Sequence, residues 1–168
     1  GSGAVEKDIY KAAKYFKLAA DQGEVDAQNF YANILLKGEG VITNKKLSAE
    51  YFKKAADQGD KDAQNSYGMM LKDGCDGEIT KNRNLAKEYL RKSAESEDIN
   101  GMMNYSDFLR EEIDPNDQSK LSKTKLKHAA YYYLKSGRLG NEKAQEKYDQ
   151  IGIEISNEDE EFFSNLNG

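Results

Sequence analysis

Apolar residues recur every three or four positions through most of the chain, which is the spacing of one face of an α-helix. Between Asp8 and Gln22 that face consists of Tyr10, Ala13, Phe16 and Ala20. Gly23 follows as a helix stop. A second stretch, 26–37, shows the same spacing, with Asp26 as its expected N-cap. Because further stretches of this kind continue to Tyr148, the pattern predicts an all-α protein.

These helical stretches form a repeat. Ala13-Lys-Tyr-Phe-Lys-Leu-Ala-Ala-Asp-Gln-Gly23 returns 36 residues later as Ala49-Glu-Tyr-Phe-Lys-Lys-Ala-Ala-Asp-Gln-Gly59. A period of this length is typical of stacked helix pairs, in which each pair buries its apolar stripe against its neighbours. Two degraded copies follow, and in the third of the four Glu97 stands where the first two have the terminal glycine.

The repeat divides the chain into segments. Residues 1–3 have the composition of a cloning scar, and 4–152 form the expected solenoid. Its units are predicted at 4–23 (partial), 24–59, 60–97, 98–140 and 141–152 (partial). The start within a unit suggests a piece of a larger protein. Residues 153–168 are predicted to form an acidic capping helix or tail, with Asn157 as N-cap and Phe162, Phe163 and Leu166 on one side.

The amino-acid composition argues against several classes of function. Acidic residues outnumber basic ones, 30 against 25, which argues against general nucleic-acid binding. No apolar run approaches the 18 or so residues that a membrane span needs, so we expect no membrane insertion. The single cysteine, Cys75, is consistent with a reducing compartment, and a cytoplasmic location is expected.

The repeat resembles the Sel-one-like repeat family, relatives of the tetratricopeptide repeats. The first unit carries the resemblance at Ala12, Tyr15, Phe16, Ala19, Ala20, Gly23, Ala27, Gln28, Ala32, Gly38, Gly40 and Val41. The second matches at Tyr51, Phe52, Ala55, Ala56, Gly59, Ala63, Gln64, Gly68 and Gly74, and the last at Ala129, Tyr132, Tyr133, Gly140, Ala144 and Gln145. The chain departs from the pattern where Tyr31, Tyr67, Tyr105 and Tyr148 replace the usual leucine.

The resemblance implies antiparallel helix pairs in a right-handed superhelix, with a concave face lined by the first helix of each pair. It also implies an adaptor or scaffold rather than an enzyme. The main functional hypothesis is therefore a domain that presents a groove to a peptide or helix of a protein partner. The alternative is a regulatory or localising domain of a larger signalling enzyme, such as a protein kinase or a ubiquitin-ligase component.

The groove residues follow from helix geometry. If Tyr31, Tyr67 and Tyr105 face a neighbouring helix, the positions two before and two after each one face away from it. With the basic residues one turn further on, the candidate groove is Asn29, Asn33, Asn65, Met69, Met103, Asp107, Lys37, Lys72 and Arg110. Asparagine amides suit a peptide backbone and methionines adapt to apolar groups. A merely solvated face explains the same residues equally well.

Other candidates favour structural roles. Tyr15, Tyr51, Tyr89 and Tyr132 recur at one packing position and are interpreted as core rather than as a recognition ladder. His128 has no companion at metal-ligand spacing and is expected to cap a helix or face solvent, and Cys75 has no nearby base. No cofactor, metal or catalytic residue is predicted. The acidic tail either caps the solenoid or docks elsewhere, including in another copy's groove, so self-association is a further hypothesis.

Overall fold

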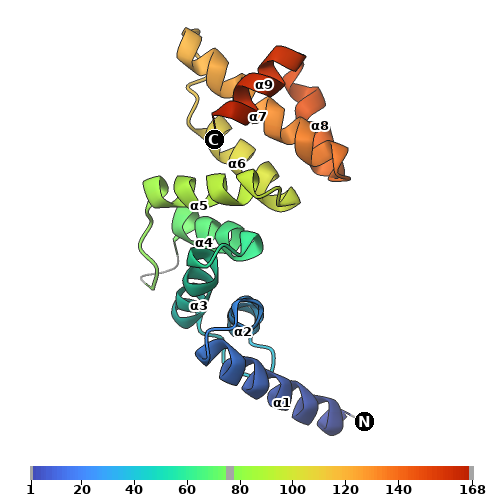
Figure 1. The fold of residues 1–168 in the computed structure, drawn as a ribbon. Helices are drawn as coiled ribbons and strands as arrows, with labels where there is room; N and C mark the ends of the chain where they lie inside the picture. The colour runs from blue at the N-terminus through green and yellow to red at the C-terminus, as the bar shows by residue number, and fades with distance from the viewer. Residues whose placement is uncertain (1, 75–77, 167–168) are drawn as a thin grey trace. The chain divides into compact units, whose positions relative to one another are not determined.

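The computed structural model describes residues 2–74 and 78–166, with side chains from residue 8 onward. In these ranges the chain forms nine α-helices and no β-strand, which confirms the predicted all-α repeat fold (Figure 1). The helices are α1 Ser2–Asp21, α2 Val25–Lys37, α3 Lys45–Asp57, α4 Lys61–Asp73, α5 Arg83–Glu95, α6 Ile99–Glu111, α7 Lys120–Arg138, α8 Glu142–Ile151 and α9 Asn157–Asn165. None of them combines the length and apolarity that crossing a bilayer requires.

The chain divides into two compact units, Gly1–Tyr89 and Leu90–Gly168. In the first unit each helix packs on the next, α1 on α2, α2 on α3 and α3 on α4. Small residues contribute to this core: Ala32, Ala55 and Ala63 are fully buried, as is the larger Phe52. Alanine lets two helix axes approach closely and costs little conformational entropy, so these buried alanines favour close helix packing.

The sequence patterns predict the N-cap residues of the helices only in part. The N-cap of α4 is Asp60, whose carboxylate accepts a hydrogen bond from the backbone N–H of Ala63. Asp60 lies two positions before Asp62, which is the residue that corresponds to Asp26 in the previous copy of the repeat. Likewise α2 begins at Val25, so the prediction that Asp26 caps it is wrong; its N-cap is Glu24, whose side chain makes no capping bond. A carboxylate within the first turn still interacts favourably with the helix dipole.

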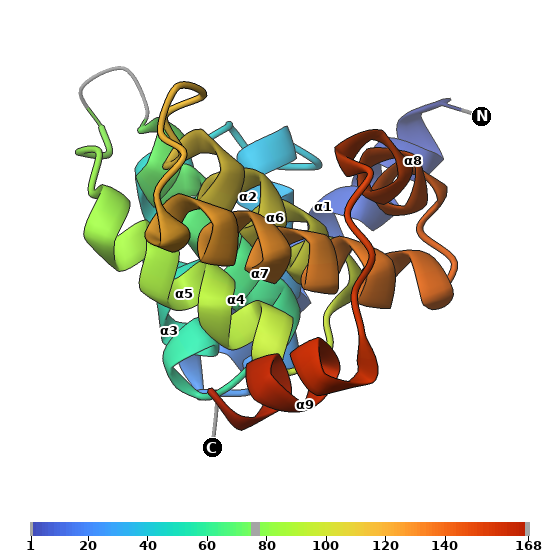
Figure 2. The same cartoon turned by 90° about the horizontal axis from the view of Figure 1, so that it is seen from above.

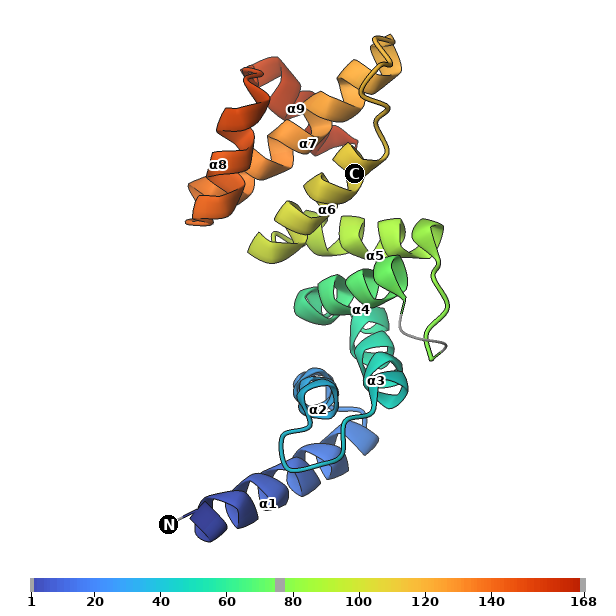
Figure 3. The same ribbon diagram turned by 180° about the vertical axis from the view of Figure 1, so that it is seen from behind.

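In the second unit α7 contacts α6, α8 and α9 (Figures 2 and 3). The N-cap of α9 is Ser156 rather than the predicted Asn157, because Ser156 and Asp159 form a reciprocal capping box. Only Phe163 of the three apolar residues is buried, whereas Phe162 and Leu166 are about half exposed. Of these three side chains, only the Phe163 ring therefore packs inward against α7.

Candidate functional site

Tyrosine side chains link successive copies of the repeat in the first unit. The Tyr51 hydroxyl donates to Asp21, and its ring meets Tyr31 edge-on at 5.0 Å. One copy later the Tyr89 hydroxyl donates to Asp57 at 2.5 Å, and its ring meets Tyr67 at 4.9 Å. Burial, and then the hydrogen bond to a carboxylate, raises the pKa of both tyrosines well above the ordinary value. Their role is structural, as the core interpretation predicts. The same prediction is wrong for Tyr15, which has 69% of its surface exposed because no described helix covers it.

Asn29 and Asn33, two residues of the predicted groove, lie half-buried on α2. The Asn29 amide donates to the Asp60 carboxylate at 3.1 Å, and so joins α2 to the N-cap of α4. The Asn33 amide donates to the Asn29 carbonyl at 3.0 Å. Burial raises the pKa of Asp60 above its usual value, against the opposing effect of its hydrogen bond from Ala63. Asn29 therefore supports the joint between two copies of the repeat.

The equivalent residues of the second unit make the same kind of joint. The Asn141 amide, at the N-cap of α8, lies 3.7 Å from the Met103 sulfur. Asp107 accepts from the Lys147 ammonium at 2.6 Å and from the Tyr133 hydroxyl. Met103 and Asp107 thus contact α8, a role in helix packing that the sequence argument did not include.

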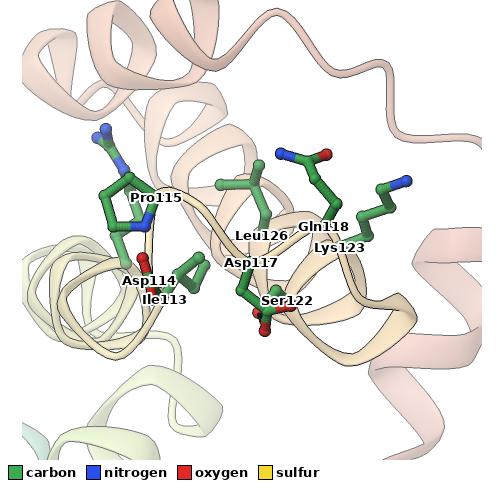
Figure 4. Close-up of a pocket in the computed structure, with 9 residues that line it drawn as sticks. Ile113, Asp114, Pro115, Asp117, Gln118, Ser122, Lys123 and Leu126 are labelled. Atoms are coloured by element: carbon green, nitrogen blue, oxygen red, sulfur yellow. Dashed lines mark hydrogen bonds between the residues drawn. The ribbon is translucent and has the colours of Figure 1, made fainter.

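The remaining predicted residues lie at the surface. Asn65, Met69 and Lys72 are half-buried along α4. Lys37 is exposed, 3.7 Å from Glu39. Arg110 is exposed and belongs to the second unit, where it lines a pocket of about 290 Å³ with the turn around Pro115 and the start of α7 (Figure 4).

The structure also shows an apolar groove that the sequence argument missed. Two adjoining pockets of 450 and 490 Å³ run between α1 and α2, and both are lined by Ala12, Phe16 and Phe30. The rings of Phe16 and Phe30 are 5.4 Å apart, and Phe30 is largely exposed. A signal was present in the sequence: Phe30 occupies the position that is Ser66 in the next copy.

Three other sequence candidates can be placed. His128 neither caps a helix nor faces solvent, because its ring stacks on Phe163 at 4.8 Å and meets Tyr132 at 5.3 Å. Gly38 ends α2 in the left-handed conformation, as expected of a helix stop. Cys75 lies outside the described residues. Among the described side chains, no three His, Cys, Asp or Glu residues gather as a metal site would require.

Comparison with known proteins agrees with this repeat architecture. The Sel1 repeat model matches residues 1–24, 25–60, 61–98 and 122–141, more than half of the chain. The chain belongs to the Sel1 repeat family. The fourth match covers nearly all of α7, whereas the long turn before α7 falls between matches.

Solved structures share the Sel1 repeat fold. One is c5321, a protective antigen of uropathogenic Escherichia coli strains with an SLR fold, at 24% identity and a TM-score of 0.74 over 95% of this chain. This chain spans 32% of that protein's length. A Sel1 repeat protein from Oxalobacter formigenes is also 24% identical, with a TM-score of 0.64 over 82% of this chain and 96% of its own. No similar sequence was found among curated proteins.

Proposed function

We propose that this Sel1 repeat chain is a protein-interaction scaffold that presents the polar surface of α2 and α4 to a peptide or helix of a partner. Sel1 repeats generally mediate protein–protein interactions, and they typically form scaffolds rather than enzymes. The observation that carries the proposal is the two-sided character of α2 and α4. Tyr31 and Tyr67 are buried on one side, whereas Asn33 and Met69 are half-buried on the other.

The chemistry of this surface suits a peptide. An asparagine amide offers both donors and an acceptor, which a peptide backbone can use in either direction. The unbranched Met69 side chain adjusts its shape to apolar groups. Lys37 and Lys72, one turn further along the same helices, favour an acidic segment next to the binding residues.

A test should change the surface without loosening the fold. Met69→Arg and Asn33→Arg add bulk and charge to half-buried positions, whereas Asn29→Arg would also break the bond to Asp60. We expect peptides selected by display against the wild-type chain to lose at least about tenfold in affinity for either arginine variant. Asn84→Arg, at an exposed asparagine of α5, is the matched control. Equal binding by all four proteins would show that these residues are only a solvated face.

Self-association through the acidic tail is a second proposal. Phe162 on α9 and Leu166, which caps the C-terminal end of that helix, are both about half exposed, and Glu158 and Glu161 nearby are exposed. Such a stripe can dock in an apolar groove. Sedimentation of the wild-type chain at rising concentration should then show association that Phe162→Ser with Leu166→Ser abolishes. Separately, the single cysteine favours a reducing compartment, and we propose a cytoplasmic location for the chain.

A further inference from the structure

The face of α7 that α9 covers differs from the same face of α3, the helix at this repeat position in the second copy. It is called here the α7 face and is formed by Lys127, His128, Tyr131 and Arg138. Tyr131 stands where α3 has exposed Glu50, and Arg138 stands where α3 has exposed Asp57. Two carboxylates of the second copy are thus replaced by an aromatic ring and a guanidinium group, which suit an acidic helix with an aromatic side chain.

The ring of Phe163 fills the aromatic part of the α7 face. It stacks on His128 with the ring centroids 4.8 Å apart, and it lies 5.6 Å from the ring of Tyr131. The Tyr131 hydroxyl and the Ser164 Oγ are hydrogen-bonded at 3.1 Å. Aromatic pairs of this kind contribute more than the area that they bury. Because Phe163 is almost fully buried, the face is a specific site for one aromatic side chain.

Two ion pairs orient the helix on the face. The Lys127 ammonium donates to Asp159 at 2.9 Å. The Arg138 guanidinium donates to Glu160 at 2.9 Å. All four residues of 158–161 are acidic and α9 has no basic residue, so its charge complements the two cations. Such pairs favour one class of partner and one orientation more than they raise affinity.

α9 has the features of a replaceable helix. It is nine residues long, and an isolated helix of that length is unstable in water. The side chains of both ion pairs are partly exposed, and pairs of that kind contribute little. A segment attached in this way can open locally while the rest of the fold stays intact. Ile155, two residues before α9, is buried and anchors the linker, so a released helix remains near the face.

We infer that the α7 face is a docking site for an acidic helix of a partner protein, and that α9 occupies it in the free chain as an autoinhibitory segment. The partner helix carries the pattern that α9 shows at 159–164, Asp-Glu-x-x-Phe-Ser. Its carboxylates pair with the two cations and its ring stacks on His128, as those of α9 do. Both helices need the same ring position, so only one binds at a time. The contacts of α9 and the charge of the face are the basis of the inference.

A second copy of this chain is a poor occupant of the α7 face. Its α9 would make the same contacts as the resident α9. The resident helix belongs to the same chain and therefore has a high effective concentration, which an exchange would lose without gaining a contact. A helix of a different protein can be longer than the nine residues of α9 and can bury more apolar area. The α7 face therefore selects a partner of a different sequence.

The test uses the full chain and a labelled peptide with the sequence of 156–166 in a fluorescence anisotropy titration. A hydrocarbon staple between positions 157 and 161 holds the peptide helical, and both positions are exposed in α9. The wild-type chain should bind this peptide weakly, because the resident helix competes from within the same chain.

Two variants of the chain release the resident helix. Phe163→Ala removes the ring that stacks on His128. Asp159→Lys with Glu160→Lys turns the two ion pairs into repulsions and keeps the ring, so it does not depend on a loss of buried apolar area. We expect each released chain to bind the peptide at least about tenfold more tightly than the wild-type chain does. Circular dichroism should show that the other helices are retained.

Charge reversal tests the specificity of the face. Arg138→Asp, which installs the residue of the second copy, should weaken peptide binding by a released chain at least about tenfold. A peptide with Glu160→Arg should restore that binding, because the ion pair forms again with its signs exchanged. Lys120→Asp is the matched control, since it makes the same change of charge at an exposed residue of α7 outside the α7 face, and it should have little effect.

Equal binding by the wild-type and the released chains would overturn the inference, because α9 would then not block the face. The absence of binding to both released chains at millimolar peptide would overturn it too. Equal weakening by Lys120→Asp and Arg138→Asp would show only a general attraction of acidic peptides. Concentration-dependent association of the wild-type chain that Arg138→Asp abolishes would assign the face to α9 of a second copy. Either of these last two results would also overturn it.

The outcome is independent of the function proposed above, because Asn33 and Met69 belong to the first unit and the α7 face belongs to the second. Met69→Arg and Asn33→Arg should each leave peptide binding by a released chain unchanged. Loss of displayed peptides in those variants, with intact binding of the α9 peptide, would support both proposals. Binding at the α7 face without any effect of either arginine variant on displayed peptides would leave only the α7 face standing.

Discussion

In the third copy of the repeat, two side chains that face each other on neighbouring helices have complementary sizes. Ser93 on α5 stands where the second copy has Ala55, and Gly101 on α6 stands where it has Ala63. A Cβ atom on Gly101 would lie 2.1 Å from the Ser93 oxygen, and Ser93 is fully buried. The larger residue on one helix is thus compensated by the smaller residue on the other, so a worn sequence keeps the same helix contact.

This compensation predicts a rescue. Gly101→Ala alone should lower the free energy of unfolding by about 1–3 kcal/mol, because the new methyl group overpacks the contact. Adding Ser93→Ala recreates the alanine pair of the second copy and should recover part of the loss, because it removes the hydroxyl but leaves the Ser93 Cβ atom 2.8 Å from the new methyl group. Urea denaturation of the two single variants and the double variant measures the coupling. A double variant no more stable than Gly101→Ala would show that the two positions do not compensate.

The turn after α5 predicts a stabilising change. Glu97 has a φ of 57°, whereas the equivalent Gly23, Gly59 and Gly140 have φ between 95° and 99°. A side chain in this left-handed region costs roughly 1 kcal/mol, and the ion pair of Glu97 with Lys135 is largely exposed and contributes little. Glu97→Gly should therefore raise the free energy of unfolding by about 0.5–1 kcal/mol, measured by urea denaturation. Ser96→Gly, at the preceding exposed residue, should lower it instead.

At the scale of elements, α9 is attached by few contacts. Phe163 stacks on His128 and lies 5.6 Å from Tyr131, while the Asp159 carboxylate accepts from Lys127 at 2.9 Å. That hydrogen bond and those from Ser156 hold the pKa of Asp159 below its usual value. The helix is short, so its stability depends on this packing and on its capping box rather than on intrinsic propensity.

Alanine substitutions at the two adjacent phenylalanines of α9 should therefore have different effects on stability. Phe163→Ala should release the helix and lower the free energy of unfolding by about 3 kcal/mol, because the ring is buried. Phe162→Ala should cost less than about 1 kcal/mol, because that ring is half exposed. Hydrogen exchange of the α9 amides, together with urea denaturation, measures both. Similar losses in the two variants would mean that α9 does not attach through Phe163.

Across the whole molecule, the repeat period was sufficient to predict the class of fold and most helix ends, because each copy follows the same local rules. Burial depended on what lies next to a copy. Tyr15 and Tyr51 share their local sequence, yet only Tyr51 is covered. The groove residues show the same limit, since the Asp60 that holds Asn29 lies 31 residues away in the chain. Contacts between copies are not encoded in the spacing within one copy.

Buried tyrosines in both units make the folded chain sensitive to alkaline pH. Burial raises the pKa of Tyr105 to about 12, and raises the pKa of Tyr51, Tyr89 and Tyr133 further, from an ordinary value of 10.0. Below that ordinary value these phenols are protonated in both the folded and the unfolded chain, and their contribution to stability is fully present. Above it the unfolded chain loses protons that the folded chain retains, so the free energy of unfolding must fall as pH rises.

We expect this fall to begin near pH 10, at about 1 kcal/mol per pH unit for each tyrosine that stays protonated in the fold. Urea denaturation between roughly pH 8 and pH 11 measures it, and near-ultraviolet absorbance should show tyrosinate appearing together with unfolding. Tyr89→Phe removes one such group and should make the fall less steep, while Tyr10→Phe, at an exposed position, should leave it unchanged. A stability that stays constant across this range would mean that the buried hydroxyls ionise without opening the joints between repeats.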